Sequence, residues 1–173
     1  MSPLRLSRAL AGCLMAAAVL VSAGCATPPP AADAALLQRM DAVLRQAAPS
    51  RPVALRLNPE TITTGRPLEA GVASPMGGFV YLFQLGTDGK TLDLVFPNAQ
   101  DGANQLQAGQ PMPLPRANWR LMARGPAGLG YLMAVVTQQP QDLQALQAGV
   151  GMGQLPVRGL YGAAMATLRE VAP

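Results

Sequence analysis

The sequence predicts a mainly β protein, an antiparallel β-sandwich of about seven strands with one or two short accessory helices. Three observations lead to this prediction. Apolar and polar residues alternate in several short segments, glycine and proline separate these segments, and two aromatic, β-branched runs flank an Asp-Gly pair. Short strands with turn signals between them are typical of sandwiches. The 149 residues from Cys25 to Pro173 are enough for one domain with its own core.

Residues 1–24 have the three-part plan of a cleaved secretory signal peptide. Arg5 and Arg8 precede an apolar run over residues 9–21, and three small residues follow it. The run is shorter than the roughly 18 to 20 residues that a membrane-spanning helix needs. We therefore expect residues 1–24 to be removed on export.

Cys25 directly follows the small residues, an arrangement that resembles the signal of bacterial lipoproteins. In these proteins the cysteine thiol receives diacylglycerol before the signal is cut. Ser22 stands where leucine is usual in such signals, and the segment ending at Cys13 fits the four-residue pattern better, but almost no apolar sequence precedes Cys13. The resemblance implies that Cys25 carries the lipid and that acyl chains bind the protein to a membrane.

The residue after the cysteine bears on the location of the protein. In enteric lipoproteins an aspartate there favours retention in the inner membrane, whereas this chain has Ala26. The resemblance thus implies an outer-membrane lipoprotein that faces the periplasm. The alternative is cleavage after Ala23 by the ordinary signal peptidase, which would leave a soluble periplasmic protein.

Two segments precede the sandwich. Residues 25–32 are expected to form a proline-rich tether, because three consecutive prolines favour an extended polyproline conformation. The segment 33–48 predicts an amphipathic helix, since its apolar residues recur at helical spacing and Asp33 is a suitable N-cap. Docking on the domain is favoured over a membrane-surface role for this helix, because only two of its residues are basic.

Residues 49–173 are expected to form the β-sandwich domain. A hairpin around Asp88-Gly89 gives the strongest strand signal, and a second strand pair is expected across the turn at residues 125–128. The stretch 160–171 fits a strand and a helix, and a closing strand is favoured because an all-β core leaves an edge to cover. The expected strands are residues 53–57, 68–72, 79–85, 91–96, 118–124, 131–137 and the closing stretch.

The remaining segments of this domain read as connections with one helix. Residues 99–115 are expected to be rich in loops, because three prolines and two turn pairs interrupt them. A short helix is expected over residues 141–148, and the glycine-rich residues 149–153 read as a flexible connection, since they lack the lysine of a phosphate loop.

Composition excludes several classes of chemistry. The chain has no histidine and two cysteines, of which Cys13 leaves with the signal and Cys25 is expected to be acylated. Zinc sites built on Cys or His, Ser-His-Asp triads and Cys-His pairs are therefore excluded. The chain after residue 24 has 11 basic and 9 acidic residues, and its arginines are scattered, so we expect no nucleic-acid partner. We also expect no metal and no cofactor.

Residues from about Leu68 to Pro140 carry an ordered set of motifs: Gly78-Phe79 opening an aromatic strand, the Asp88-Gly89 turn, and Leu94-Val95-Phe96-Pro97-Asn98. This set resembles an uncharacterised bacterial domain family of unknown function, family 4384, in which leucine is common where this chain has Val95. The resemblance implies a β-rich, non-catalytic module found in envelope lipoproteins and appended to bacterial Ser/Thr kinases and caspase-like proteins. Some relatives are associated with secretion machinery, which implies an accessory role in a type VI apparatus as an alternative.

Residues Phe96, Pro97 and Asn98 form a candidate recognition loop. A structural turn is the favoured interpretation, because proline stops strand pairing and asparagine tolerates turn conformations. Asp88 with Asp93, and Asp101 with Asn104, are alternative ligand or acid-base pairs, but surface turn residues explain them more simply. The seven scattered methionines after residue 24 are interpreted as core filling rather than copper ligands.

The function expected from the sequence is therefore a non-catalytic binding or assembly module. It would be held to the membrane by acyl groups on Cys25 and would bind an envelope protein. The alternative from another class is a cell-wall hydrolase that uses carboxylates, which needs a general acid and a general base in one cleft. No residue is assigned a catalytic role.

Overall fold

The structure is a computed structural model that describes residues 31–116 and 119–173. The predicted signal peptide, Cys25 and most of the predicted tether lie outside the described residues. Within the described ranges no helix is both long enough and apolar enough to span a bilayer.

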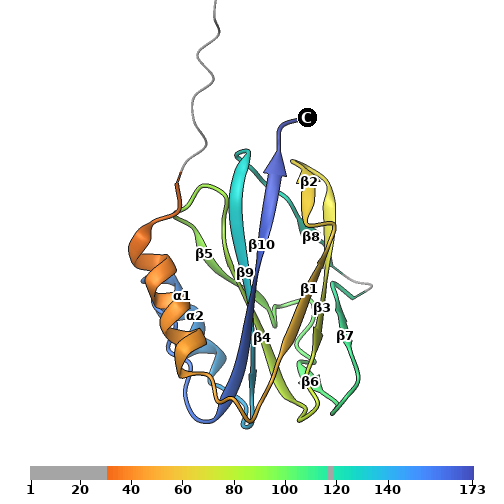
Figure 1. The fold of residues 1–173 in the computed structure, drawn as a ribbon, viewed down its shortest axis with the longest axis vertical. Coiled ribbons are helices and arrows are strands. Elements are labelled where there is room, and N and C mark those ends of the chain that lie inside the picture. The colour runs from red at the N-terminus through yellow and green to blue at the C-terminus, as the bar shows by residue number, and fades with distance from the viewer. Residues whose placement is uncertain (1–30, 117–118) are drawn as a thin grey trace, which may run out of the picture.

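The described residues form three layers, with two helices on one side, a six-stranded sheet in the middle and a four-stranded sheet on the other side (Figure 1). The prediction of a mainly β fold with antiparallel sheets is confirmed, and one pair, β2 with β10, is parallel. The six-stranded sheet runs β2 (Thr61–Thr63), β10 (Tyr161–Val171), β9 (Gly128–Thr137), β4 (Gly78–Leu85) and β5 (Leu92–Phe96), with β6 (Gln105–Leu106) also paired to β4. The four-stranded sheet runs β1 (Ala54–Asn58), β3 (Pro67–Ala73) and β7 (Met112–Leu114), with β8 (Leu121–Met122) also paired to β3.

Strand β4 explains how the two cores are divided. Successive side chains of a strand point to opposite faces of its sheet. Val80 and Leu82 therefore enter the core between the sheets, while Tyr81 and Phe83 enter the core beneath the helices, and all four are at most 2% exposed. Burial on both faces is the reason that this strand is almost continuously apolar in sequence.

The helices form the third layer. The first, α1 (Ala34–Gln46), begins where the sequence predicts, with the Asp33 carboxylate accepting hydrogen bonds from the N–H groups of Ala35 at 2.8 Å and Leu36 at 3.3 Å. Its apolar face packs on the six-stranded sheet, as the docking interpretation requires. The second helix, α2 (Leu143–Gly151), has Asp142 as its N-cap. Both helices cover the face of the sheet that the four-stranded sheet leaves open (Figure 1).

Met40 tests the docking of α1, because its side chain is fully buried against the sheet. Met40→Ala should lower the free energy of unfolding by about 2 to 3 kcal/mol through lost apolar burial and the resulting cavity. Gln38→Ala on the exposed face of the same helix should change it by less than about 0.5 kcal/mol. Denaturant unfolding measures both, and equal small effects would show that α1 does not dock on the sheet.

The predicted pairing of residues 118–124 with 131–137 is wrong. Strand β8 pairs with β3 in the smaller sheet, whereas β9 pairs with β4 and β10 in the larger one. The turn between them is therefore a crossing from one sheet to the other. The Gly125 N–H donates to the Glu170 carboxylate on β10 at 2.6 Å, which stabilises this crossing.

The glycine-rich segment is also not a flexible connection at its start. Residues 149–151 form the last turn of α2, and the side chain of Val150 in this turn is buried. A Cβ on Gly149 would lie 2.6 Å from the ring of Pro156, so glycine is what allows the following chain to pack against the helix. The segment predicted to be loops, residues 99–115, contains the short strands β6 and β7.

The closing strand favoured at the C-terminus is present as β10. Its place differs from the expectation, because it lies inside the larger sheet between β2 and β9 rather than at an edge. It pairs with β9 over ten residues, from Tyr161 opposite Thr137 to Glu170 opposite Gly128.

Candidate functional site

A groove of about 440 Å³ lies where the two sheets leave a side of the sandwich open. One wall is formed by β5 and the turn over residues 86–91, which belong to the larger sheet. The facing wall is formed by residues 119–125, which include β8 of the smaller sheet. Polar side chains from both walls line the groove, so its surface suits a hydrogen-bonding ligand.

The turn at the first wall is built around Asp88. Its carboxylate accepts hydrogen bonds from the N–H groups of Lys90 and Thr91, each at 3.0 Å, and from the Thr91 hydroxyl. Gly89 has a φ of +71°, a conformation that glycine adopts without steric cost. Burial opposes ionisation of Asp88, but the hydrogen bonds from Thr91 and Lys90 outweigh it and lower the pKa of this carboxyl. Asp88 is thus ionised and engaged in holding its own turn.

Asp101 stands at the centre of a second polar arrangement, the Asp101 cluster, formed by Phe96, Asn98, Asp101, Arg116 and Trp119. Asp101 accepts from Arg116 Nε at 2.7 Å and from the indole Nε1 of Trp119 at 3.2 Å, and a second Arg116 nitrogen binds its other oxygen. The hydrogen bond from Arg116 is the main reason that the pKa of Asp101 lies below its ordinary value. The interpretation of Asp101 as a surface turn residue is wrong, because this residue is 9% exposed.

The predicted recognition loop is largely enclosed by this cluster. Phe96 is fully buried and stacks on Trp119 with ring centroids 6.2 Å apart and planes 5° apart, and the Arg116 guanidinium lies 5.3 Å from the Phe96 centroid. Pro97 is also buried. Asn98 is half-buried and lines the groove, so of the three residues it alone reaches that surface.

Asn98 also has a structural task. Its amide nitrogen donates to the carbonyl of Val95 at 3.0 Å, and its amide oxygen accepts from the N–H groups of Gln100 and Asp101, each at 3.0 Å. The main chains of Asn98 and Asp101 exchange two further hydrogen bonds of 3.1 Å. These contacts explain the Phe-Pro-Asn motif as a hydrogen-bonded turn that places Asp101 next to Arg116.

The Asp101 cluster makes stability depend on pH. Because folding lowers the pKa of Asp101, its contribution is present above the unfolded value near 3.9 and is lost as the pH falls through the folded value. Asp101→Asn should lower the free energy of unfolding by about 1 to 3 kcal/mol at pH 7, since the donors of Arg116 and Trp119 lose a charged acceptor.

The difference between wild type and Asp101→Asn should shrink as the pH is lowered below about 4. Asp93→Asn, at an exposed position, should change the unfolding free energy by less than about 0.5 kcal/mol at pH 7. Urea unfolding at several pH values measures these quantities. A difference for Asp101→Asn that stays constant from pH 7 to pH 2.5 would contradict the assigned role.

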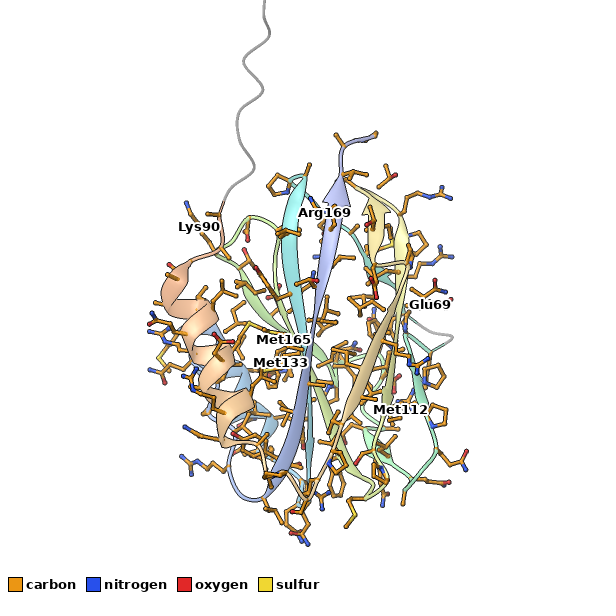
Figure 2. All side chains as sticks on the ribbon, viewed as in Figure 1. Glu69, Lys90, Met112, Met133, Met165 and Arg169 are labelled. Atoms are coloured by element: carbon orange, nitrogen blue, oxygen red, sulfur yellow. The ribbon has the colours of Figure 1, made fainter. Side chains whose placement is uncertain are left out.

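The other candidate ligands are dispersed. Asp93 and Glu170 line the groove with Asp88, but Glu170 is buried and accepts from Gly125 N–H. Over residues 31–116 and 119–173 no three cysteine, histidine or acidic side chains are placed to hold one metal ion. Figure 2 shows that the methionines serve different layers, since Met133 and Met165 lie beneath the helices and Met112 lies on the smaller sheet. Met76 and Met152 are exposed, so core filling does not explain all of the methionines.

The fold and the groove define a class: a two-sheet β-sandwich with a helical third layer and a polar groove along one sheet edge. Residues 61–140 match the family described as Domain of unknown function (DUF4384), the family that the motifs of this segment resemble. No curated protein and no solved structure matches the chain. The family match runs from β2 to β9, whereas α1, β1, α2 and β10 complete the three layers from outside it.

Proposed function

We propose that the protein is a lipid-anchored envelope module that acts by binding another envelope protein rather than by catalysis. In this proposal Cys25 carries the acyl groups, and the body faces the periplasm from the outer membrane. The observation that carries the binding role is the polar groove between the 86–91 turn and residues 119–125. Such a groove along a sheet edge offers both side-chain and main-chain contacts to a partner.

The engagement of the groove carboxylates supports binding over hydrolysis. A general acid and a general base need carboxyl groups that can exchange protons with a substrate. Asp88 instead accepts three hydrogen bonds from its own turn, and Glu170 is buried and accepts from a main-chain N–H. Among the described acidic residues that line the groove, Asp93 is thus the one whose carboxylate accepts no hydrogen bond from the protein.

The proposed anchor also limits how far the folded body can lie from the membrane. Seven residues, Ala26 to Ala32, separate Cys25 from Asp33. A chain of this length spans at most about 25 Å. Asp33 N–H donates to the Gly89 carbonyl at 2.7 Å, so the chain enters the body beside the 86–91 turn. In the proposal this turn, with Lys90 and Arg169 at the same end of the body (Figure 2), lies close to the membrane surface.

Crosslinking in intact cells tests the binding role. A photo-reactive residue at position 93 lies in the groove, while one at position 56 lies on the exposed part of β1 in the other sheet. The proposal expects a discrete crosslinked protein from position 93 that position 56 does not give. Equal labelling from both positions would contradict it, as would wall-cleaving activity of the purified protein that Asp93→Asn abolishes.

A further inference from the structure

The groove lies along an unpaired sheet edge. Strand β5 is the last strand in the order of the six-stranded sheet, and within the described part of the chain it pairs with β4 alone. The facing strand β8 pairs with β3. The main chain of β5 is therefore open to the groove on the side that faces away from β4, where Asp93, Leu94 and Val95 line it.

The register shows which main-chain groups are available. Gly86 N–H donates to Thr91 O at 2.8 Å, which makes these residues a hydrogen-bonded pair at the end of the hairpin. Hydrogen-bonded and non-hydrogen-bonded pairs alternate along antiparallel strands. The next pairs are Leu85 with Leu92, Gln84 with Asp93, and Phe83 with Leu94. The N–H and C=O groups of Leu92 and Leu94 consequently point away from β4, toward the open edge.

Edge strands usually carry features that prevent pairing with another chain, such as proline, lysine or inward-pointing charges. Over Leu92–Phe96 the sequence is Leu-Asp-Leu-Val-Phe, which has no proline and no lysine. Asp93 is its single charged residue. A β-bulge at Val95 ends the regular register, so the part of the edge suited to accept a further strand is Leu92 to Leu94.

The charges of the groove indicate the chemistry of that strand. Arg120 and Arg124 are exposed on the wall opposite β5, and within the described residues neither forms an ion pair. The carboxylates of Asp88 and Glu170 already accept main-chain hydrogen bonds. Among its described residues, the groove therefore has one free carboxylate, that of Asp93, and two arginines. Carboxylates on the incoming segment would complement this excess of positive charge. A second copy of β5 in the same place would instead bring two Asp93 side chains to one interface.

We propose that β5 binds an extended, carboxylate-bearing segment of a partner protein as an additional strand of the six-stranded sheet. The main chain of that segment bonds to Leu92 and Leu94, and its acidic side chains reach Arg120 and Arg124. This inference rests on the proposed function and specifies how the partner is recognised. Strand addition is a common mode in which main-chain bonds supply affinity and side-chain contacts supply specificity.

The test uses the full mature protein in detergent micelles and a displayed library of random dodecapeptides. Selected peptides should contain acidic residues and a proline-free stretch, and a selected synthetic peptide should slow amide hydrogen exchange at Leu92 and Leu94. The double variant Arg120→Glu with Arg124→Glu should weaken its binding by about tenfold or more. Arg56→Glu, a charge reversal of the same kind at one exposed position on β1, should leave the affinity unchanged.

Leu94→Pro supplies a second arm, because it removes a main-chain donor from the open edge while sparing the bonds to β4. It should weaken binding by about tenfold. Enrichment of basic or proline-rich peptides, protection at amides outside β5, or no enrichment would overturn strand addition. A crosslinked partner from position 93 would still support the broader binding role in that case, so the two proposals fail separately.

Discussion

Cys25→Ser is expected to move nearly all of the protein from the membrane fraction to the soluble periplasmic fraction. The proposed attachment depends on acyl chains, each buried methylene contributing about 0.8 kcal/mol, and one chain binds only marginally while several bind stably. Serine at this position has no thiol to accept the lipid, so the whole of this contribution disappears. Cell fractionation followed by immunoblotting measures the change.

Cys13→Ser is the matched control for this prediction. Cys13 lies within the predicted signal peptide and should be removed with it, so its replacement should leave the protein in the membrane fraction. If the protein lacking the Cys25 thiol stayed in the membrane pellet after a salt wash, lipidation at this residue would be wrong. Loss of the protein from the membrane in the Cys13 variant would instead assign the anchor to the earlier cysteine.

Gly78→Ala should destabilise the fold by about 3 kcal/mol or more. Gly78 opens β4 with a φ of +134°, a conformation that L side chains rarely adopt, and such strain costs about 1 to 3 kcal/mol. An added Cβ would also lie 2.3 Å from the Thr137 carbonyl oxygen, which is fixed in β9. A main-chain atom in the sheet has no alternative rotamer, so a further overpacking cost of about 1 to 3 kcal/mol follows.

Gly102→Ala is the control for Gly78→Ala, because a Cβ there meets no atom within 4 Å and the residue has no positive φ. It should change the free energy of unfolding by less than about 0.5 kcal/mol. Chemical denaturation of both variants gives the comparison. A Gly78→Ala protein as stable as wild type would show that the glycine of this motif is not required by the close approach of β9.

Local sequence patterns predicted the elements whose structure is decided by residues close together in the sequence. The run from Phe79 to Leu85 is buried on both faces, so its composition alone indicated an inner strand. The N-cap at Asp33 and the apolar face of α1 likewise follow from residues within one helix. The Asp88-Gly89 turn was predicted because the hydrogen bonds of the Asp88 carboxylate connect residues at most three apart.

The errors arose where distant parts of the chain decide the outcome. Residues 121–122 and 128–137 are neighbours in sequence, but Gly125 bonds to Glu170 on β10, and nothing near the turn signals a change of sheet. Strands of two or three residues, such as β6 and β7, are too short to show an alternating pattern.

Contacts between residues far apart in the sequence also limited the prediction of the candidate site. Phe96 and Asn98 were identified from the motif, but Arg116 and Trp119 were missed because they reach Asp101 from 15 and 18 residues away. The single tryptophan of the chain was the available signal, since a partly buried indole N–H favours an acceptor. The open edge of β5 depends on the strand order of the whole sheet, which no local pattern of Leu92–Phe96 contains.

We propose that fatty acyl groups on Cys25 hold this three-layered body at the membrane, where its groove meets a partner. The most direct measurement is the intact mass of the protein purified from its native host. The expected mass is that of a chain that starts at Cys25 and carries its acyl groups. A chain that starts at Gly24 without modification, or one that retains its first 24 residues, would contradict it.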